Sequence, residues 1–128
     1  MDLAFLQLDE VLEIHQDQIQ RYGGSPGVRD IGILQSALAM PEAGFGGRYL
    51  HEDVFEMAAT YLFHIVQGHP FIDGNKRAGA MAAFVFLSMN GISLNAADNS
   101  FESLVRSVAQ GKTNKATISE FFRRHSKS

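Results

Sequence analysis

Two long apolar segments on either side of a short polar loop constrain this chain most. Residues 53–67 and 78–89 carry apolar side chains on more than one helical face, which indicates helices buried on most sides. The second segment is rich in alanine and glycine, which permit close helix packing. No stretch reaches the roughly 18 uncharged apolar residues that a membrane helix needs. We therefore expect two central helices in an all-α fold.

Apolar spacing and helix-ending residues predict about six helices in all and almost no sheet. The other helices are expected at about 9–21, 30–40, 101–110 and 118–125. Asp30 is expected to cap the second helix, Gly68 to end the first central helix in the left-handed conformation, and Thr117–Glu120 to open the last as a capping box. Residues 42–50 contain three glycines around Phe45 and are expected to form a loop, a candidate flap over a site.

The composition fits one globular domain that spans residues 1–128. Hydrophobic residues make up 45% and charged residues 20%, as in folded domains of this length. The absence of cysteine excludes disulfides, thiolate zinc sites and thiol nucleophiles. The N-terminus has no basic region followed by an apolar one, as a secretory signal has, so we expect a cytoplasmic protein without membrane contact.

The charge is unevenly distributed along the chain, and its net value is −3. Residues 1–99 carry five Lys or Arg against twelve Asp or Glu, whereas residues 100–128 carry six against two. Because non-specific nucleic-acid affinity comes from neutralising phosphates, this acidic balance predicts no direct nucleic-acid binding. Lys76 is the only lysine before Lys112, and Arg77 follows it directly. The few cations of the acidic part are therefore concentrated at one place.

That place is the loop at residues 69–77, which reads His-Pro-Phe-Ile-Asp-Gly-Asn-Lys-Arg. The loop opens the second central helix, whose first backbone N–H groups have no partner within the helix and lie at the positive end of its dipole. Such a helix start is a ready-made phosphate site, and Gly74 lets a ligand approach the backbone closely. Lys76 and Arg77 add positive charge, and Asn75 adds a neutral donor and acceptor.

Other residues of the loop suit the chemistry of a nucleotide. Asp73 is the kind of oxygen ligand that Mg²⁺ bound to phosphates prefers, and His69 titrates near neutral pH, which suits a base for an attacking hydroxyl. Phe71 and Ile72 are expected to anchor the loop in the core. The alternative is a plain helix start with an aspartate N-cap, two surface cations and a histidine bound to the backbone. All these groups within nine positions favour the phosphate site.

The motif resembles the signature of the death-on-curing (Doc) toxins, the small branch of the Fic superfamily. Residues 21–27 with Asp30, 54–61 and 86–91 also resemble that family in order and spacing. The resemblance covers nearly the whole chain and implies a single compact Fic/Doc-like helical domain with the motif loop between two central helices. It also implies the toxin of a type II toxin–antitoxin system, neutralised by an antitoxin whose C-terminal segment docks on it. Doc toxins move the γ-phosphate of ATP to a hydroxyl on elongation factor Tu and so inhibit translation.

Carried over residue by residue, the resemblance implies a role for each position of the motif. His69 is the expected base that activates the acceptor hydroxyl. Asp73 is expected to hold Mg²⁺ and to orient the substrate. The expected phosphate ligands, of which the last two are also catalytic, are Gly74, Asn75, Lys76 and Arg77. Phe71 is expected to be structural.

Two positions favour phosphoryl transfer over the AMP transfer of Fic enzymes. Fic enzymes usually carry glycine in place of Lys76 and a second arginine in place of Ala80. A lysine obstructs the Fic-type nucleotide pose, and its charge suits a transferring phosphoryl group. AMP transfer to a protein hydroxyl is the alternative, and so is a catalytically degenerate antitoxin-binding or co-repressor module. The latter is favoured by Ala78-Gly79, where Doc-type sequences commonly carry Thr-Ala.

Control by a separate antitoxin is also favoured, because the sequence has no Ser/Thr-x-x-x-Glu stretch of the self-inhibiting Fic type. Among the other histidines, His64 lies five residues before His69, a spacing that one helix face does not use for metal ligands. A hydrogen-bonded interior or site-lining role is expected for it. Candidate contacts to substrate in or beside the glycine-containing loop are His51, Arg48 and Tyr49. Surface positions are expected for His15 and His125.

Overall fold

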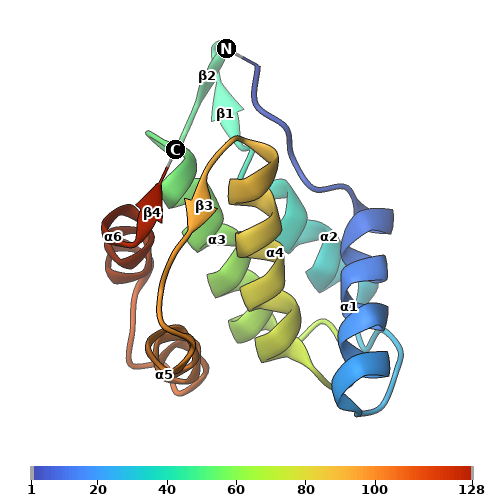
Figure 1. Cartoon of the computed structure of the whole chain (residues 1–128). Coiled ribbons are helices and arrows are strands. Elements are labelled where there is room, and N and C mark those ends of the chain that lie inside the picture. The colour runs from blue at the N-terminus through green and yellow to red at the C-terminus, as the bar shows by residue number, and fades with distance from the viewer. Residues whose placement is uncertain (1, 128) are drawn as a thin grey trace.

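The computed structural model describes residues 2–127, and within them it contains six helices and two small antiparallel strand pairs (Figure 1). The helices are α1 (Leu8–Tyr22), α2 (Ile31–Ala39), α3 (Val54–Gly68), α4 (Asn75–Met89), α5 (Asp98–Ala109) and α6 (Lys115–Arg124). Strand β1 (Gly44–Phe45) pairs with β2 (Arg48–Tyr49), and β3 (Ser93–Leu94) pairs with β4 (Ser126–Lys127). The expectation of an all-α fold with about six helices is confirmed.

Helices α3 and α4 form the antiparallel centre of the fold, as their apolar patterns predicted (Figure 1). Helix α1 packs on α4 and α2 on α3, while α5 and α6 cover the pair from the other side. The largest fully buried side chains come from all these layers and from the motif loop: Tyr61, Phe71, Phe86, Phe122, Leu34 and Met57. No helix within residues 2–127 is long and apolar enough to cross a membrane.

Residues 42–50 form a hairpin of β1 and β2 rather than an open loop, and this hairpin lies far from the motif. It precedes the start of α3, whereas His69 follows the end of α3 (Figure 1). Because α3 has 15 residues, its ends are about 22 Å apart. The candidate flap over a site therefore does not cover the motif. The hairpin carries Phe45 at its turn with 94% of the residue exposed.

The predicted helix ends are correct in part. The side chain of Asp30 caps α2 as expected. Gly68 is the last residue of α3, and His69 rather than Gly68 takes the left-handed conformation. A Cβ on Gly68 would lie 2.8 Å from Ile33 Cγ2, so close packing on α2 accounts for this glycine. Helix α6 begins one turn early because Asn114 accepts the Thr117 N–H, and the capping box at 117–120 is therefore wrong.

The central pair packs closely at Gly79 of α4, which faces α3. A Cβ at this position would lie 2.7 Å from Val66 Cγ2 and 3.2 Å from the carbonyl oxygen of Leu62. Neither neighbour is at the free end of a flexible side chain. The two helix axes can therefore approach this closely only because Gly79 has no side chain.

We expect Gly79→Ala to lower the free energy of unfolding by about 1–3 kcal/mol, because overpacking outweighs the gain in helix propensity. Denaturant unfolding followed by circular dichroism measures this change. In a Val66→Ala background, which removes Cγ2, the same substitution should cost less. Equal costs in the two backgrounds would contradict the proposed contact.

Candidate active site

The motif residues form one pocket where the chain passes from α3 to α4. The pocket has a volume of about 290 Å³ and is lined by His69, Ile72, Asp73, Gly74, Asn75, Lys76 and Arg77. All the polar residues of the motif singled out in the sequence thus lie together. Phe71 lies beneath them and is 1% exposed, whereas Ile72 is 57% exposed. The prediction that Ile72 anchors the loop in the core is therefore wrong.

His69 is held in a strained backbone conformation beside the pocket. Its φ of 51° makes it the one non-glycine residue with positive φ in residues 2–127. This conformation costs an L-residue energy, so the surroundings must impose it. Arg29 does so from the loop before α2: its Nε donates to the His69 carbonyl oxygen at 2.6 Å, and its Nη2 donates to the Gly68 carbonyl oxygen at 2.9 Å. The exposed His69 is thus fixed through its backbone.

Asn75 shapes the loop with its side chain. Its Oδ1 accepts the Phe71 N–H at 2.9 Å, and its Nδ2 donates to the Phe71 carbonyl oxygen at 3.0 Å. The same Nδ2 lies 3.5 Å from His69 Nδ1. The buried amide is therefore occupied by protein groups, and what Asn75 offers to a phosphate without rearrangement is its backbone N–H at the start of α4.

Asp73 presents an ionised carboxylate at the mouth of the pocket. Its Oδ2 accepts the Ser25 N–H at 3.2 Å, and its Oδ1 accepts the Gly74 N–H at 2.8 Å. These two N–H groups lower the pKa of Asp73 below its ordinary value, and the charge of Arg77 acts in the same direction. A Cβ on Gly24 would lie 2.8 Å from Asp73 Oδ2, so glycine at that position makes room for the carboxylate.

The carboxylate oxygens of Asp73 are suited to bind a Mg²⁺ ion that carries a nucleotide. Each carboxylate oxygen accepts one hydrogen bond, which leaves lone pairs for a cation. Residues 2–127 contain no group of three His, Asp or Glu side chains placed to hold a metal. Mg²⁺ usually takes one or two carboxylates and completes its shell with phosphate and water oxygens. Asp73 fits that pattern.

The two cations of the motif differ in their contacts. Arg77 donates to the carbonyl oxygens of Gln18 at 3.2 Å and Gly23 at 2.9 Å, and so fastens the end of α1 to the start of α4. Lys76 is exposed and makes no hydrogen bond or ion pair with the described part of the chain. The Lys76 ammonium is therefore available to a ligand, whereas Arg77 also has structural partners.

His15 belongs to this site, and the prediction of a surface position for it is wrong. It is 4% exposed, and its Nε2 lies 2.7 Å from the carbonyl oxygen of Asp73. The signal was present in the sequence, since His15 is four residues from both Val11 and Ile19, which are buried on the same face of α1. Arg29 also went unnoticed, because its partners are backbone carbonyl groups, which have no sequence pattern.

The candidates around the hairpin are not part of this pocket. Tyr49 packs against Phe5, and His51 Nε2 lies 3.2 Å from the Met40 carbonyl oxygen. Both positions, like that of Arg48, precede α3 and thus lie at the end of the central pair opposite the motif (Figure 1).

The two remaining histidines have structural partners. His64 is half-buried, and its Nε2 lies 2.9 Å from Lys115 Nζ, which agrees with the expected hydrogen-bonded role. Burial, followed by the charge of Lys115, lowers the pKa of His64, so this histidine is neutral near pH 7. His125 is half-buried against the ring of Phe121 rather than free at the surface.

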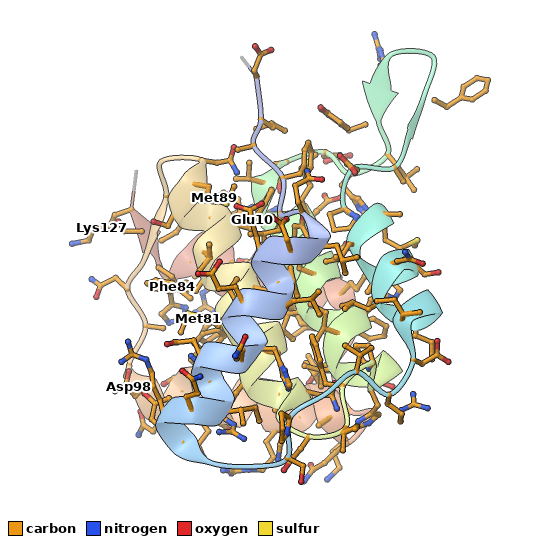
Figure 2. The ribbon with its side chains drawn as sticks, turned by 90° about the vertical axis from the view of Figure 1, so that its right-hand side faces the viewer. Glu10, Met81, Phe84, Met89, Asp98 and Lys127 are labelled. Carbon is orange, nitrogen blue, oxygen red and sulfur yellow. The ribbon has the colours of Figure 1, made fainter. Side chains whose placement is uncertain are left out.

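A larger concavity, here called the α4 groove, begins beside the motif pocket. It consists of two adjoining pockets of about 480 Å³ each, which share Arg77, Ala80, Asp98 and Phe101. Most of its other lining is apolar, and it includes Met81 and Phe84, which lie on the face beside α1 (Figure 2). Arg77 lines both the groove and the motif pocket, so the two are connected.

Comparisons with known proteins agree with the resemblance of the motif. The model of the Fic/DOC family matches residues 5–87, which include the whole motif. The protein kinase doc of Escherichia phage P1 is 32% identical over 119 residues, which cover 91% of this chain and 90% of the relative. The toxin Doc of Mycolicibacterium smegmatis is 39% identical over 75 residues, 59% of this chain and 58% of the relative. The chain therefore belongs to the Fic/DOC family and, within it, to the Doc toxins.

Proposed function

We propose that this protein is the toxin of a type II toxin–antitoxin system and acts as a protein phosphotransferase. It moves the γ-phosphate of ATP to a hydroxyl of a translation factor, which is elongation factor Tu by resemblance. The observation that carries the proposal is the single pocket that joins His69, Asp73 and Lys76 at the N-terminus of α4. The names of the two relatives, one a protein kinase and the other a toxin, support it.

In the proposed reaction, His69 acts as the base. It takes the proton of the acceptor hydroxyl while the hydroxyl oxygen bonds to the γ-phosphorus; the bond from that phosphorus to the β–γ bridging oxygen breaks, and ADP leaves. The Asn75 amide nitrogen, which is a hydrogen-bond donor, lies 3.5 Å from His69 Nδ1. The Lys76 charge and the N–H groups of α4 stabilise the transferring phosphoryl group.

Asp73 is the residue that would hold Mg²⁺ in this reaction. When bound to ATP, Mg²⁺ neutralises charge on the β- and γ-phosphates. Hydrogen bonds from Ser25 and Gly74 keep the carboxylate ionised and fix its direction. Asp73 thus enters the reaction already oriented. This supports the choice of Asp73 as the cation ligand.

The structure also bears on the alternatives. Ala80, which takes the place of the second Fic arginine, lines the α4 groove without adding charge, and this supports γ-phosphate over AMP transfer. Ala78 and Gly79 are buried in α4, and neither lines the motif pocket. The departure from Thr-Ala therefore leaves the groups of the pocket unchanged, which argues against a degenerate module.

The α4 groove is the surface that we assign to the antitoxin segment. It adjoins the motif pocket through Arg77 and much of its lining is apolar, so a peptide that fills it would lie over Arg77. Phe84 is 41% exposed within this groove, although a phenylalanine side chain is more stable when buried. An apolar segment of the partner would cover it. Neutralisation then follows from closing access to the phosphate site.

We expect His69→Ala to reduce phosphate transfer by about 10²–10⁴-fold or more, the usual contribution of a general base, and to abolish toxicity. The assay combines purified protein, elongation factor Tu and ATP labelled separately at the α- and γ-phosphates. His51→Ala, at the far end of the central helices, is the matched control and should retain transfer. Thermal unfolding should be unchanged in His69→Ala, because His69 is exposed.

The label decides between the enzymatic alternatives. Transfer of the γ-label alone, lost in His69→Ala, supports the kinase. Transfer of the α-label shows AMP transfer instead and overturns the argument from Lys76 and Ala80. If neither label moves, growth after expression without antitoxin separates a wrong target from an inactive protein, because an inactive protein leaves growth unaltered.

For the antitoxin surface, we expect Phe84→Gln to weaken binding of the cognate antitoxin by about tenfold or more, as for a buried aromatic anchor at an interface. Isothermal calorimetry measures the affinity. Met89→Gln is the control, because Met89 is 38% exposed on the same helix but does not line the groove (Figure 2). Equal affinities for Phe84→Gln and wild type would place the antitoxin elsewhere.

A further inference from the structure

A buried histidine outside the motif touches the backbone of the motif loop. The ring of His15 stacks on Phe71 with the planes 4° apart and the ring centres at 3.8 Å. Its Nε2 lies 2.7 Å from the Asp73 carbonyl oxygen. Because a carbonyl oxygen only accepts hydrogen bonds, Nε2 must carry a proton, both in neutral His15 and in its cation. The stack fixes the ring plane, so the direction of this donor is fixed as well.

The hydrogen bond determines which way one peptide group faces. In a trans peptide the C=O and N–H point to opposite sides. With the Asp73 carbonyl oxygen turned toward His15, the Gly74 N–H points away from His15 and meets Asp73 Oδ1 at 2.8 Å. The Gly74 N–H therefore lies on the side of the pocket, beside the group that we assign to the cation.

This peptide group is able to flip, because Gly74 has a φ of 76° and no Cβ to oppose either orientation. A flip would turn the Asp73 carbonyl oxygen toward the pocket, where it would repel phosphate oxygens. Within residues 2–127, His15 is the hydrogen-bond donor to this carbonyl oxygen. A Cβ on Gly74 would lie 3.6 Å from His15 Nε2, so the imidazole lies directly against the peptide.

We infer that His15 is a positioning residue, which holds the Asp73–Gly74 peptide in the orientation that accepts the phosphates of ATP. The inference rests on the proposed function for the identity of the ligand, and on the contacts of His15 for the mechanism. His15 does not touch the substrate. It acts through the Gly74 N–H and, through that N–H, on the direction of the Asp73 carboxylate.

Two substitutions separate the hydrogen bond from the packing. His15→Phe keeps an aromatic ring against Phe71 but has no donor, whereas His15→Gln places an amide N–H near the position of Nε2. We expect His15→Phe to weaken ATP binding by about tenfold, the effect of losing one buried hydrogen bond. His15→Gln should restore most of the affinity. The KM for ATP should rise in His15→Phe while the KM for the acceptor protein stays unchanged, which a general loss of structure would not produce.

Binding is measured without the acceptor protein, by titrating ATP with Mg²⁺ and, separately, inorganic phosphate while following the amide NMR signal of Gly74. In the wild type the signal should shift on binding; in His15→Phe the shift should be smaller and need more ligand. Wild-type protein that shows this shift but transfers no phosphate and leaves growth unaltered when expressed without antitoxin would refute the proposed function and leave the role of His15 standing. A Gly74 signal that neither ligand moves in the wild type would overturn the role itself.

The role of His15 would also be overturned if His15→Phe bound ATP as tightly as the wild type does. If His15→Phe does not fold, the ¹⁵N spectrum of the wild-type imidazole decides, because the inference requires a protonated Nε2. An unprotonated Nε2 would contradict it.

Discussion

The tight reversal between α3 and α4 is the constraint on which the rest of this structure depends. Two buried antiparallel helices meet at Gly79, and six residues from His69 to Gly74 connect them. The reversal brings the last carbonyl groups of one helix beside the first N–H groups of the next, which are opposite ends of two helix dipoles. Arg29 occupies the carbonyl end of α3. The N–H end of α4 faces a pocket, and this asymmetry leaves those N–H groups open to the phosphate ligand that we propose.

A loop this short cannot hold its own shape, and residues 15–30 supply the groups that do so. The Gly27 carbonyl oxygen accepts the Ile72 N–H, and the Ser25 N–H binds the Asp73 carboxylate. Gly24 leaves room for that carboxylate. The segment at residues 21–27, which also resembles the Doc family in order and spacing, thus contributes to the same site.

The sequence predicted the parts of the fold that depend on local patterns. The central helices were predicted from apolar spacing, and the cap at Asp30 was predicted from the preference of N-cap positions for aspartate. The prediction that Gly68 takes the left-handed conformation at the end of α3 was wrong because tertiary contacts decide that end. Gly68 is needed for packing on α2, and the two hydrogen bonds from Arg29 impose the left-handed conformation on His69. In the site, the side chains of the motif were found, whereas His15 and Arg29, which act from outside the motif on its backbone, were not.

The position of Arg77 joins the two activities that we propose for this surface. Its guanidinium is held by carbonyl groups at the end of α1, and it lines both the motif pocket and the α4 groove. A segment bound in the groove therefore contacts a residue that is already rigid, so it can block the phosphate site without moving the loop. Lys76, the neighbouring cation without a partner in residues 2–127, lines both the groove and the motif pocket as well, and in the proposed reaction it is free to follow the phosphoryl group. In the proposed function, a segment bound in the groove would cover both cations: the fixed Arg77 would support it, and the free Lys76 would be withheld from the phosphoryl group.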